Sequence, residues 1–261
     1  MSTPPINRLQ AVAPRVTEVL HDLARELELT NEELLAIVGF LAEVGRADEF
    51  MLLSDVLGLS RVVDDLSHQG ATGTDSTVLG PFYRPGAPWL DNPGRLARDG
   101  EPGRRLRVRG QVSDAATGAA LPSAVLDLWH SDNAGDYSNE NAALDPFNLR
   151  GRQRTDDRGR YEFETVAPVP YEVKKDGPVG QLLRVLDRHA WRPAHIHFRV
   201  SAEGYRTLTT MAYFADDPYL ASDTINGVKN PLVLNLEPDD EGVAGACFDV
   251  QLGQLDSVSG S

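Results

Sequence analysis

Cysteine is nearly absent from this sequence, because Cys247 is the single example in 261 residues. One cysteine excludes a disulfide within the chain, and it excludes zinc or iron–sulfur sites built from several cysteines. The scarcity of cysteine also favours a reducing compartment. Acidic residues outnumber basic ones, 39 to 25, so the net charge is −14. Because nucleic-acid binding relies on Lys and Arg side chains that neutralise phosphates, this balance argues against a nucleic-acid partner.

Long hydrophobic runs are missing as well. The longest apolar stretch runs only from Leu34 to Ala42, whereas a membrane span needs roughly twenty residues. The first residues, Met1 to Asn7, lack the basic segment followed by an apolar one that marks a secretory signal. The sequence therefore predicts a soluble, cytoplasmic protein with no membrane span. Hydrophobic residues still make up 41% of the chain, which is enough for a sizeable core.

A helical pattern occupies about the first 70 residues. Apolar residues recur at intervals of three and four from Val16 to Leu27, which indicates an amphipathic helix. Thr30 and Glu33 have the spacing of a capping box, and a second periodic apolar run follows them. A third helix is predicted from about Asp48 to His68.

From about residue 104 the apolar period changes to two, which is typical of strands. Turn signals rich in Asp and Gly separate short candidate strands at Leu106–Gly110, Val125–Trp129, Tyr161–Glu164, Ile196–Val200, Leu232–Leu234 and Cys247–Val250. This pattern predicts a mainly β fold, an immunoglobulin- or transthyretin-like β-sandwich, with an N-terminal α-helical domain. We expect a helical domain at 1–70, a Gly- and Pro-rich linker at 71–103, the sandwich at 104–252 and a flexible tail at 253–261. Long loops are predicted at 131–153 and 167–192.

The strongest local feature is the pair His195 and His197. Because residues two apart on a strand face the same way, both imidazoles would project together while Ile196 and Phe198 point into the core. Two adjacent imidazoles can share a metal ion. The same spacing also occurs by chance on half-exposed strands, so metal binding and a structural role both stay open on spacing alone.

Each of the two long loops offers one tyrosine beside a turn, Tyr137 and Tyr171. A lone tyrosine is usually a rim or core residue. A phenol has a pKa of about 10, so a strongly Lewis-acidic ion is needed to hold it as a phenolate at neutral pH. Two tyrosines together with two histidines would therefore select Fe(III) over Zn(II).

Several motifs, in this order, resemble those of the intradiol ring-cleaving dioxygenases, non-haem ferric enzymes that act on catechols. The resemblance covers nearly the whole chain and is carried by Trp129–His130, Gly135–Ser138, Phe147–Arg150, Asp176–Pro178, Arg188–His189 and Arg192–Phe198. It implies one non-haem Fe(III) per chain, with Tyr137, Tyr171, His195 and His197 as the ligands. Tyr171 and His197 would be axial. Arg192 would lie beside the substrate, and Arg192 and Tyr171 would be the catalytic residues.

The resemblance also indicates a substrate. The segments Leu52–Ser60 and Thr77–Phe82 look most like the branch that acts on hydroxyquinol (1,2,4-trihydroxybenzene), with O2 inserted between two hydroxylated carbons to give 3-hydroxy-cis,cis-muconate or maleylacetate. Asp55 could accept a hydrogen bond from the third ring hydroxyl, which catechol lacks, or could be a solvated helix residue. The substrate contacts implied are Leu52, Asp55, Val78, Leu79, Gly80, Pro81, Phe82, Val173, Lys174, Arg192 and Ile225.

Two positions depart from the family pattern. Lys174 stands where the family usually has proline, and it would either attract an anionic substituent or point to solvent. Met211 stands where catechol-type members carry glutamine. Two alternatives stay open: catechol or chlorocatechol as the substrate, giving cis,cis-muconates, and a non-catalytic transthyretin-like binding module.

The resemblance further implies partners beyond the aromatic diol or triol and O2. It predicts a homodimer packed through the N-terminal helices, which would also cap the pocket, with room for a lipid between the subunits. The apolar stripe from Val16 to Leu27 fits such a dimer and fits packing within one chain equally well.

Overall fold

The computed structural model describes residues 6–238 and 242–255, and the chain divides into two compact units, one up to Asp48 and one from Glu49 onward. The division falls earlier in the chain than the predicted domain boundary at residue 70. The first unit contains α1 (Ile6–Glu26) and α2 (Asn31–Arg46). Thr30 caps α2 with the predicted capping box, in which its side chain accepts from the Glu33 N–H and Glu33 accepts from the Thr30 N–H.

The second unit begins with two helices where the pattern predicted one. α3 (Phe50–Val56) and α4 (Leu59–Ser67) are separated at Gly58, which has a φ of 76°. Glycine adopts this left-handed conformation without a Cβ penalty, so the chain turns there. The prediction of one continuous helix from Asp48 to His68 is therefore wrong, because its apolar periodicity does not register the break.

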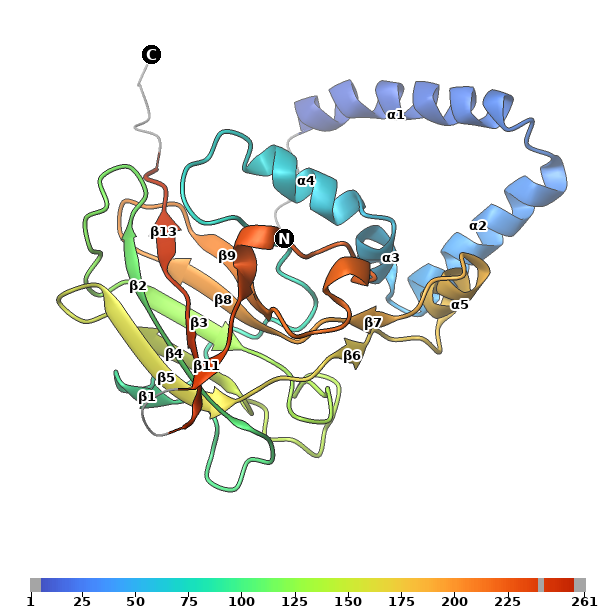
Figure 1. Ribbon diagram of the computed structural model, residues 1–261. Helices are drawn as coiled ribbons and strands as arrows, with labels where there is room; N and C mark the ends of the chain where they lie inside the picture. Colours follow the sequence, from blue (N-terminus) through green and yellow to red (C-terminus); the bar gives the residue numbers. More distant parts are fainter. Residues whose placement is uncertain (1–5, 239–241, 256–261) are drawn as a thin grey trace, which may run out of the picture. The chain divides into compact units, whose positions relative to one another are not determined.

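A β-sandwich forms the rest of this unit, as predicted (Figure 1). One sheet has the order β1-β5-β2-β12-β11 with β13 also paired to β2, and the other has the order β10-β9-β8-β3-β4. The strands are β1 (Gly94–Arg95), β2 (Arg105–Asp114), β3 (Val125–Trp129), β4 (Arg150–Arg154), β5 (Arg160–Val166), β8 (His195–Ser201), β9 (Leu208–Phe214), β10 (Val233–Leu234), β11 (Glu237–Pro238), β12 (Ala244–Cys247) and β13 (Val250–Leu252).

The core lies between these two sheets. Alternate residues of β2 and β5 face alternate residues of β3, β8 and β9, and the rings of Phe163 and Phe198 lie with centroids 6.2 Å apart. Burial of such apolar side chains contributes about 25 cal/mol per Å² and is the main favourable term for the fold. The predicted period of two is thus confirmed for β8, where Ile196 and Phe198 enter the core.

Several local predictions differ from the structure. The predicted last strand is split, because Phe248 and Asp249 interrupt it and the carbonyl of Phe248 crosses close above Gly110 of β2. The predicted loops contain β4 and then β6 (Tyr171–Glu172), α5 (Pro178–Val185) and β7 (Trp191–Arg192). Short 3-10 turns at Leu220–Ser222 and Asn230–Leu232 follow β9. The Arg-rich sequence of β4 has no apolar alternation, which is why the pattern misses it.

The predicted linker and the start of the predicted tail both make contacts with the rest of the protein. Ala87 and Leu96 of the linker are buried, and β1 pairs in parallel with β5. In the tail the N–H of Leu255 donates to the carbonyl of Gly204, while residues 256–261 lie outside the described residues. No helix in the described part of the chain is long and apolar enough to cross a membrane.

Candidate active site

Two histidines of β8 define the centre of the site. β8 pairs with β3 on one side and with β9 on the other, so its side chains are held by two neighbouring strands. The alternation that sends Ile196 and Phe198 into the core turns His195 and His197 to the opposite face. The Nε2 atoms of the two imidazoles lie 3.2 Å apart, and both side chains are buried.

Two tyrosines from separate segments reach the same point. Tyr137, between β3 and β4, places its hydroxyl 3.3 Å from Nε2 of His197 and 3.5 Å from Nε2 of His195. Tyr171 begins β6, and its ring centroid lies 5.5 Å from that of Tyr137 and 5.7 Å from that of His195. The structure thus brings together the four residues that the motifs singled out.

Neighbouring groups fix the orientation of both imidazoles. Nδ1 of His195 lies 2.7 Å from the carbonyl oxygen of Pro193, so it is assigned the proton and the lone pair of Nε2 faces the tyrosines. The indole of Trp129 stacks on His197 with centroids 4.5 Å apart and planes within 7°. Nδ1 of His197 has no hydrogen-bond partner among the described residues. Both histidines therefore present Nε2 to the same small volume.

Burial controls the protonation of these four groups. It lowers the pKa of His195 and of His197 well below the usual value, and the Arg192 charge lowers both further, so the rings are neutral. Burial also raises the pKa of Tyr137 and of Tyr171, although Arg192 opposes the rise at Tyr171. A cation bound here would favour the phenolates over the phenols and would need the imidazoles neutral.

The donor set fits a hard, trivalent metal ion. Three donor atoms, from Tyr137, His195 and His197, lie 3.2–3.5 Å from one another. Atoms bound to one ion at about 2 Å have such separations. Within the described ranges no group of three or more His, Cys, Asp or Glu residues could hold a metal ion. An ion held here by the two histidines would take the phenols as its further donors, and anionic oxygen donors suit Fe(III).

Comparison with known proteins agrees with this chemistry. Residues 7–75 match the family described as catechol dioxygenase N terminus, and residues 78–254 match the family described as dioxygenase. The chain belongs to the intradiol ring-cleaving dioxygenases. It is therefore an enzyme, and the alternative of a non-catalytic binding module is wrong.

The relatives of this chain include enzymes that are named for different substrates. A hydroxyquinol 1,2-dioxygenase of Rhizobium sp. is 40% identical over 88% of this chain and 80% of the relative. A chlorocatechol 1,2-dioxygenase of Rhodococcus opacus is 43% identical over 86% of this chain and 88% of the relative. The solved structure of a hydroxyquinol 1,2-dioxygenase from Pseudomonas putida aligns with a TM-score of 0.90 and 36% identity, covering 97% of this chain and 94% of that one.

Arg192 of this dioxygenase lies against two of the four candidate ligands. Its Nη1 is 3.3 Å from the hydroxyl of Tyr171 and 3.3 Å from Nε2 of His195. Asp223 holds the other side of the guanidinium, with Oδ1 3.1 Å from Nε and Oδ2 3.4 Å from Nη2. The sequence pattern did not reveal Asp223, because nothing in its spacing connects a loop aspartate to an arginine 31 residues earlier.

A second buried arginine, also missed, anchors the segment that carries Tyr137. Nε of Arg150 donates to the hydroxyl of Ser138, its Nη2 donates to Asn139, and its Nη1 lies 2.6 Å from the carbonyl oxygen of Phe82. Burial lowers the pKa of Arg150 to about 10, so it is charged at neutral pH. The Phe82 ring stacks on Tyr137 with centroids 4.1 Å apart. Arg150 thus joins two segments of the site.

The other predicted substrate contacts lie at differing distances from this centre. A Cβ added to Gly80 would lie 3.9 Å from Cε1 of His197, so the backbone at Gly80 borders the site, as Phe82 does. Val78 packs against the core, whereas Leu79 and Pro81 are exposed. Leu52 and Asp55 lie on α3, Val173 follows β6, and Ile225 lies in the turn after Asp223. Contact with substrate stays a prediction for all of them.

Lys174 has a partner in the protein. Its Nζ lies 3.2 Å from Oε1 of Glu49, a buried residue whose Oε2 accepts from the N–H of Val179 in the first turn of α5. A Cβ at Gly177 would overlap the Glu49 carboxylate. The ammonium therefore balances a buried carboxylate that caps a helix, which neither of the two predicted roles of Lys174 anticipated.

Met211 lies beside Arg192. Its sulfur is 3.7 Å from Nη2 of Arg192, and the hydroxyl of Tyr213 donates to that sulfur at 3.2 Å. The same hydroxyl is 3.4 Å from Nη2. The thioether and the phenol thus contact the same nitrogen, Nη2, that Asp223 Oδ2 engages, and the sulfur is only a weak acceptor.

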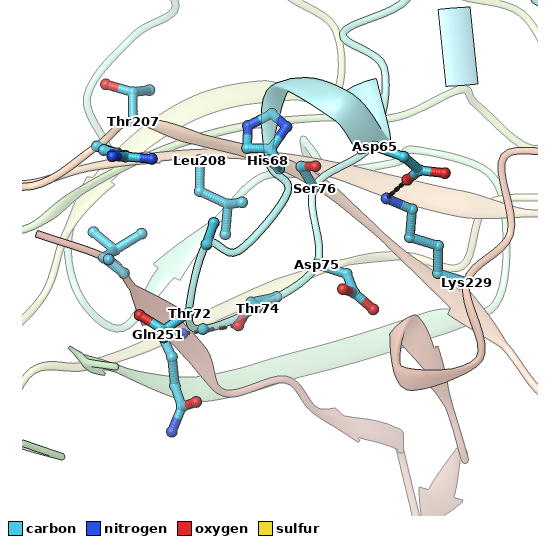
Figure 2. A pocket seen from close by; sticks show the side chains of 15 residues that line it. Asp65, His68, Thr72, Thr74, Asp75, Ser76, Thr207, Leu208, Lys229 and Gln251 are labelled. Atoms are coloured by element: carbon cyan, nitrogen blue, oxygen red, sulfur yellow. Dashed lines mark hydrogen bonds and ion pairs between the residues drawn. The ribbon is translucent and has the colours of Figure 1, made fainter. Parts of the chain in front are cut away.

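The cavity in Figure 2 belongs to another part of this unit. It has a volume of about 210 Å³ and lies between the end of α4, residues 71–76 and β13. Lys229 of its lining is paired, with Nζ 2.7 Å from Asp65 and 3.2 Å from Asp64. None of the predicted site residues lines it.

Proposed function

We propose that Tyr137, Tyr171, His195 and His197 hold one non-haem Fe(III) per chain, and that the substrate is hydroxyquinol. The convergence of two neutral imidazoles and two phenols on one point carries the proposal for the metal. When bound, Fe(III) withdraws electron density from a chelated catecholate and makes its ring reactive toward O2. Metal analysis of the purified protein tests the proposal for the metal. The visible spectrum is a second test, because ferric tyrosinate absorbs visible light.

The chain's own residues supply proton transfer and charge stabilisation. A catechol that binds as a dianion must lose two protons; the Tyr171 phenolate would accept one of them, and a hydroxide would accept the other. Nη1 of Arg192, 3.3 Å from that oxygen, stabilises the negative charge that develops on the ring oxygens. Arg192 is itself held by Asp223, and the Phe82 ring covers Tyr137 and excludes water from it.

Asp55 supports hydroxyquinol over catechol. Its carboxyl is buried, and its Oδ1 has no hydrogen-bond partner among the described residues. A buried polar atom without a partner costs about 1–3 kcal/mol, so a third ring hydroxyl that bonded to Oδ1 would recover that energy on binding. Burial also raises the pKa of Asp55, although the Ser60 hydroxyl and the Arg192 charge oppose the rise.

Replacement of Asp55 by Ala is expected to lower kcat/KM for hydroxyquinol by about 10²-fold, because a charge-assisted hydrogen bond is lost. The loss for catechol should be less than about threefold, since catechol has no third hydroxyl. Steady-state kinetics on both substrates measures the difference, and Asp55→Asn, which keeps an acceptor oxygen, should fall between. Equal losses on the two substrates would contradict the role of Asp55.

Catechol or chlorocatechol is the second candidate substrate, favoured by the 43% identity to a chlorocatechol enzyme. Initial rates on hydroxyquinol, catechol and a chlorocatechol, measured side by side on the iron-loaded enzyme, separate the two. A kcat/KM for hydroxyquinol below that for catechol would overturn the proposal for the substrate and leave the proposal for the metal intact.

The homodimer predicted above would form through the helices of the first unit. Val16 and Leu20 of the α1 stripe remain 50% and 57% exposed within that unit, so apolar surface is left for a partner. Val16→Glu combined with Leu20→Glu is expected to convert a dimer to a monomer in sedimentation velocity. Arg15→Glu, which adds the same side chain on the polar face, serves as the control. A lipid at that interface and a cytoplasmic location also stay predictions.

A further inference from the structure

Asp223 is a buried carboxylate that is hydrogen-bonded through both of its oxygens. It lies in the loop after β9 with its side chain 2% exposed, and it meets the guanidinium of Arg192 with both oxygens. The same oxygens accept from the N–H groups of Ile225 and Gly227. The loop therefore folds around Asp223, and that fold places Ile225.

The contacts of Arg192 leave its guanidinium a single orientation. With Nε and one face of Nη2 on Asp223, Nη1 is directed at Tyr171 and His195. A Cβ on Gly227 would lie 3.0 Å from Oδ2 of Asp223 and 3.1 Å from Nη2 of Arg192, so the loop backbone packs directly on the ion pair. A bidentate pair of this kind fixes direction as well as charge.

The helix that carries a second buried carboxylate, Asp55 of α3, is tied to the Asp223 loop. Arg188 donates to the carbonyl oxygen of Val56, next to Asp55, and to that of Thr224, next to Asp223. Asp55 is buried, and its Oδ1 has no partner in the described part of the chain. Two buried carboxylates near one guanidinium cannot both be neutralised by it, and an unpaired buried charge is costly. The carboxylate that Arg192 does not engage is the one left to bind a ligand.

We propose that Asp223 is a positioning residue that also determines specificity: by engaging Arg192 it keeps the guanidinium directed at Tyr171 and His195, and so leaves Asp55 free for the third hydroxyl of the substrate. This proposal rests on the proposed role of Asp55. Without the Asp223 charge, Arg192 turns toward Asp55 and occupies its carboxylate. Selectivity for hydroxyquinol then falls, although neither Asp55 nor any candidate metal ligand has changed.

The test is a double-mutant cycle on the iron-loaded enzyme, with the ratio of kcat/KM for hydroxyquinol to kcat/KM for catechol as the readout. Asp223→Asn removes the charge but keeps one acceptor oxygen, which can serve the N–H of Gly227, the shorter of the two loop contacts. We expect it to lower the ratio by about tenfold and to shift the visible absorption band, because Nη1 moves away from Tyr171. In the Asp55→Asn background the same substitution should leave the ratio unchanged.

Three further variants serve as controls for the cycle. Asp216→Asn, an exposed position of the same loop, should alter neither the ratio nor the band. Tyr213→Phe removes one contact to Nη2 but leaves the ion pair, so its ratio should stay close to that of the unmodified enzyme. Asp223→Glu retains the charge and should restore most of the ratio. If Asp223→Asn does not fold, the cycle is run with Asp223→Glu, whose smaller loss should vanish with Asp55→Asn.

The outcomes separate this proposal from the proposed substrate. A ratio that is unchanged in Asp223→Asn, or that falls equally with and without Asp55, overturns the role of Asp223. A ratio below one in the unmodified enzyme instead overturns hydroxyquinol as the substrate.

Discussion

Tyr137→Phe is expected to leave the protein folded but to remove its iron and its visible absorption. The phenylalanine ring keeps the stacking on Phe82, at 4.1 Å between centroids, so packing changes little. The hydroxyl that lies within 3.5 Å of both Nε2 atoms is lost. Changes beside a metal site already cost about 10–100-fold in metal affinity, so loss of an anionic ligand should lower iron affinity by at least about 10²-fold.

Iron content by atomic absorption, the visible spectrum and thermal unfolding of the metal-free protein together check this result. Tyr219→Phe is the matched control, because its ring stacks on Trp191 and lies outside the metal centre. Normal iron content and colour in Tyr137→Phe would show that this phenol is not a ligand. Loss of the unfolding transition would instead indicate a structural role.

Local pattern predicted the pair of histidines at the centre of the candidate site. His195 and His197 are two apart on one strand, and strand geometry alone puts their side chains on one face. The position of Tyr137 and Tyr171 beside them could not come from spacing, because both lie in segments whose path depends on tertiary contacts. The family resemblance supplied that link.

The supporting residues could not be predicted from the sequence for a physical reason. Asp223 and Arg150 act through pairs made across the fold, and a charged residue in a loop looks the same whether it is solvated or buried. Glu49 caps α5 from a position 130 residues away. The break at Gly58 was also missed, since an apolar period of three to four continues through it. A sequence pattern shows the periodicity of apolar residues, whereas the hydrogen bonds and ion pairs between distant residues depend on the folded structure.

Arg192→Lys is expected to reduce kcat by about 10²–10³-fold while iron content stays unchanged. Lysine keeps a cation for Asp223, so the protein avoids an unpaired buried carboxylate, a defect that costs about 3–5 kcal/mol when a partner is removed altogether. A compact ammonium cannot hold Asp223 and also reach Tyr171, as the forked guanidinium does through Nε and Nη1. The charge directed at the reacting oxygens is thereby lost, and removal of one such donor has effects of this size.

Single-turnover kinetics with the enzyme in excess measures the Arg192→Lys effect on the chemical step apart from product release. The step itself should slow, and substrate affinity should change by a smaller factor, because the charge on the ring oxygens grows as the reaction proceeds. Arg184→Lys on the exposed side of α5 is the control, since the side chain of Arg184 contacts only the carbonyl of Lys175 among the hydrogen bonds described. An unchanged chemical step with weakened binding would mean that Arg192 binds the ground state alone, and would remove it from the catalytic residues.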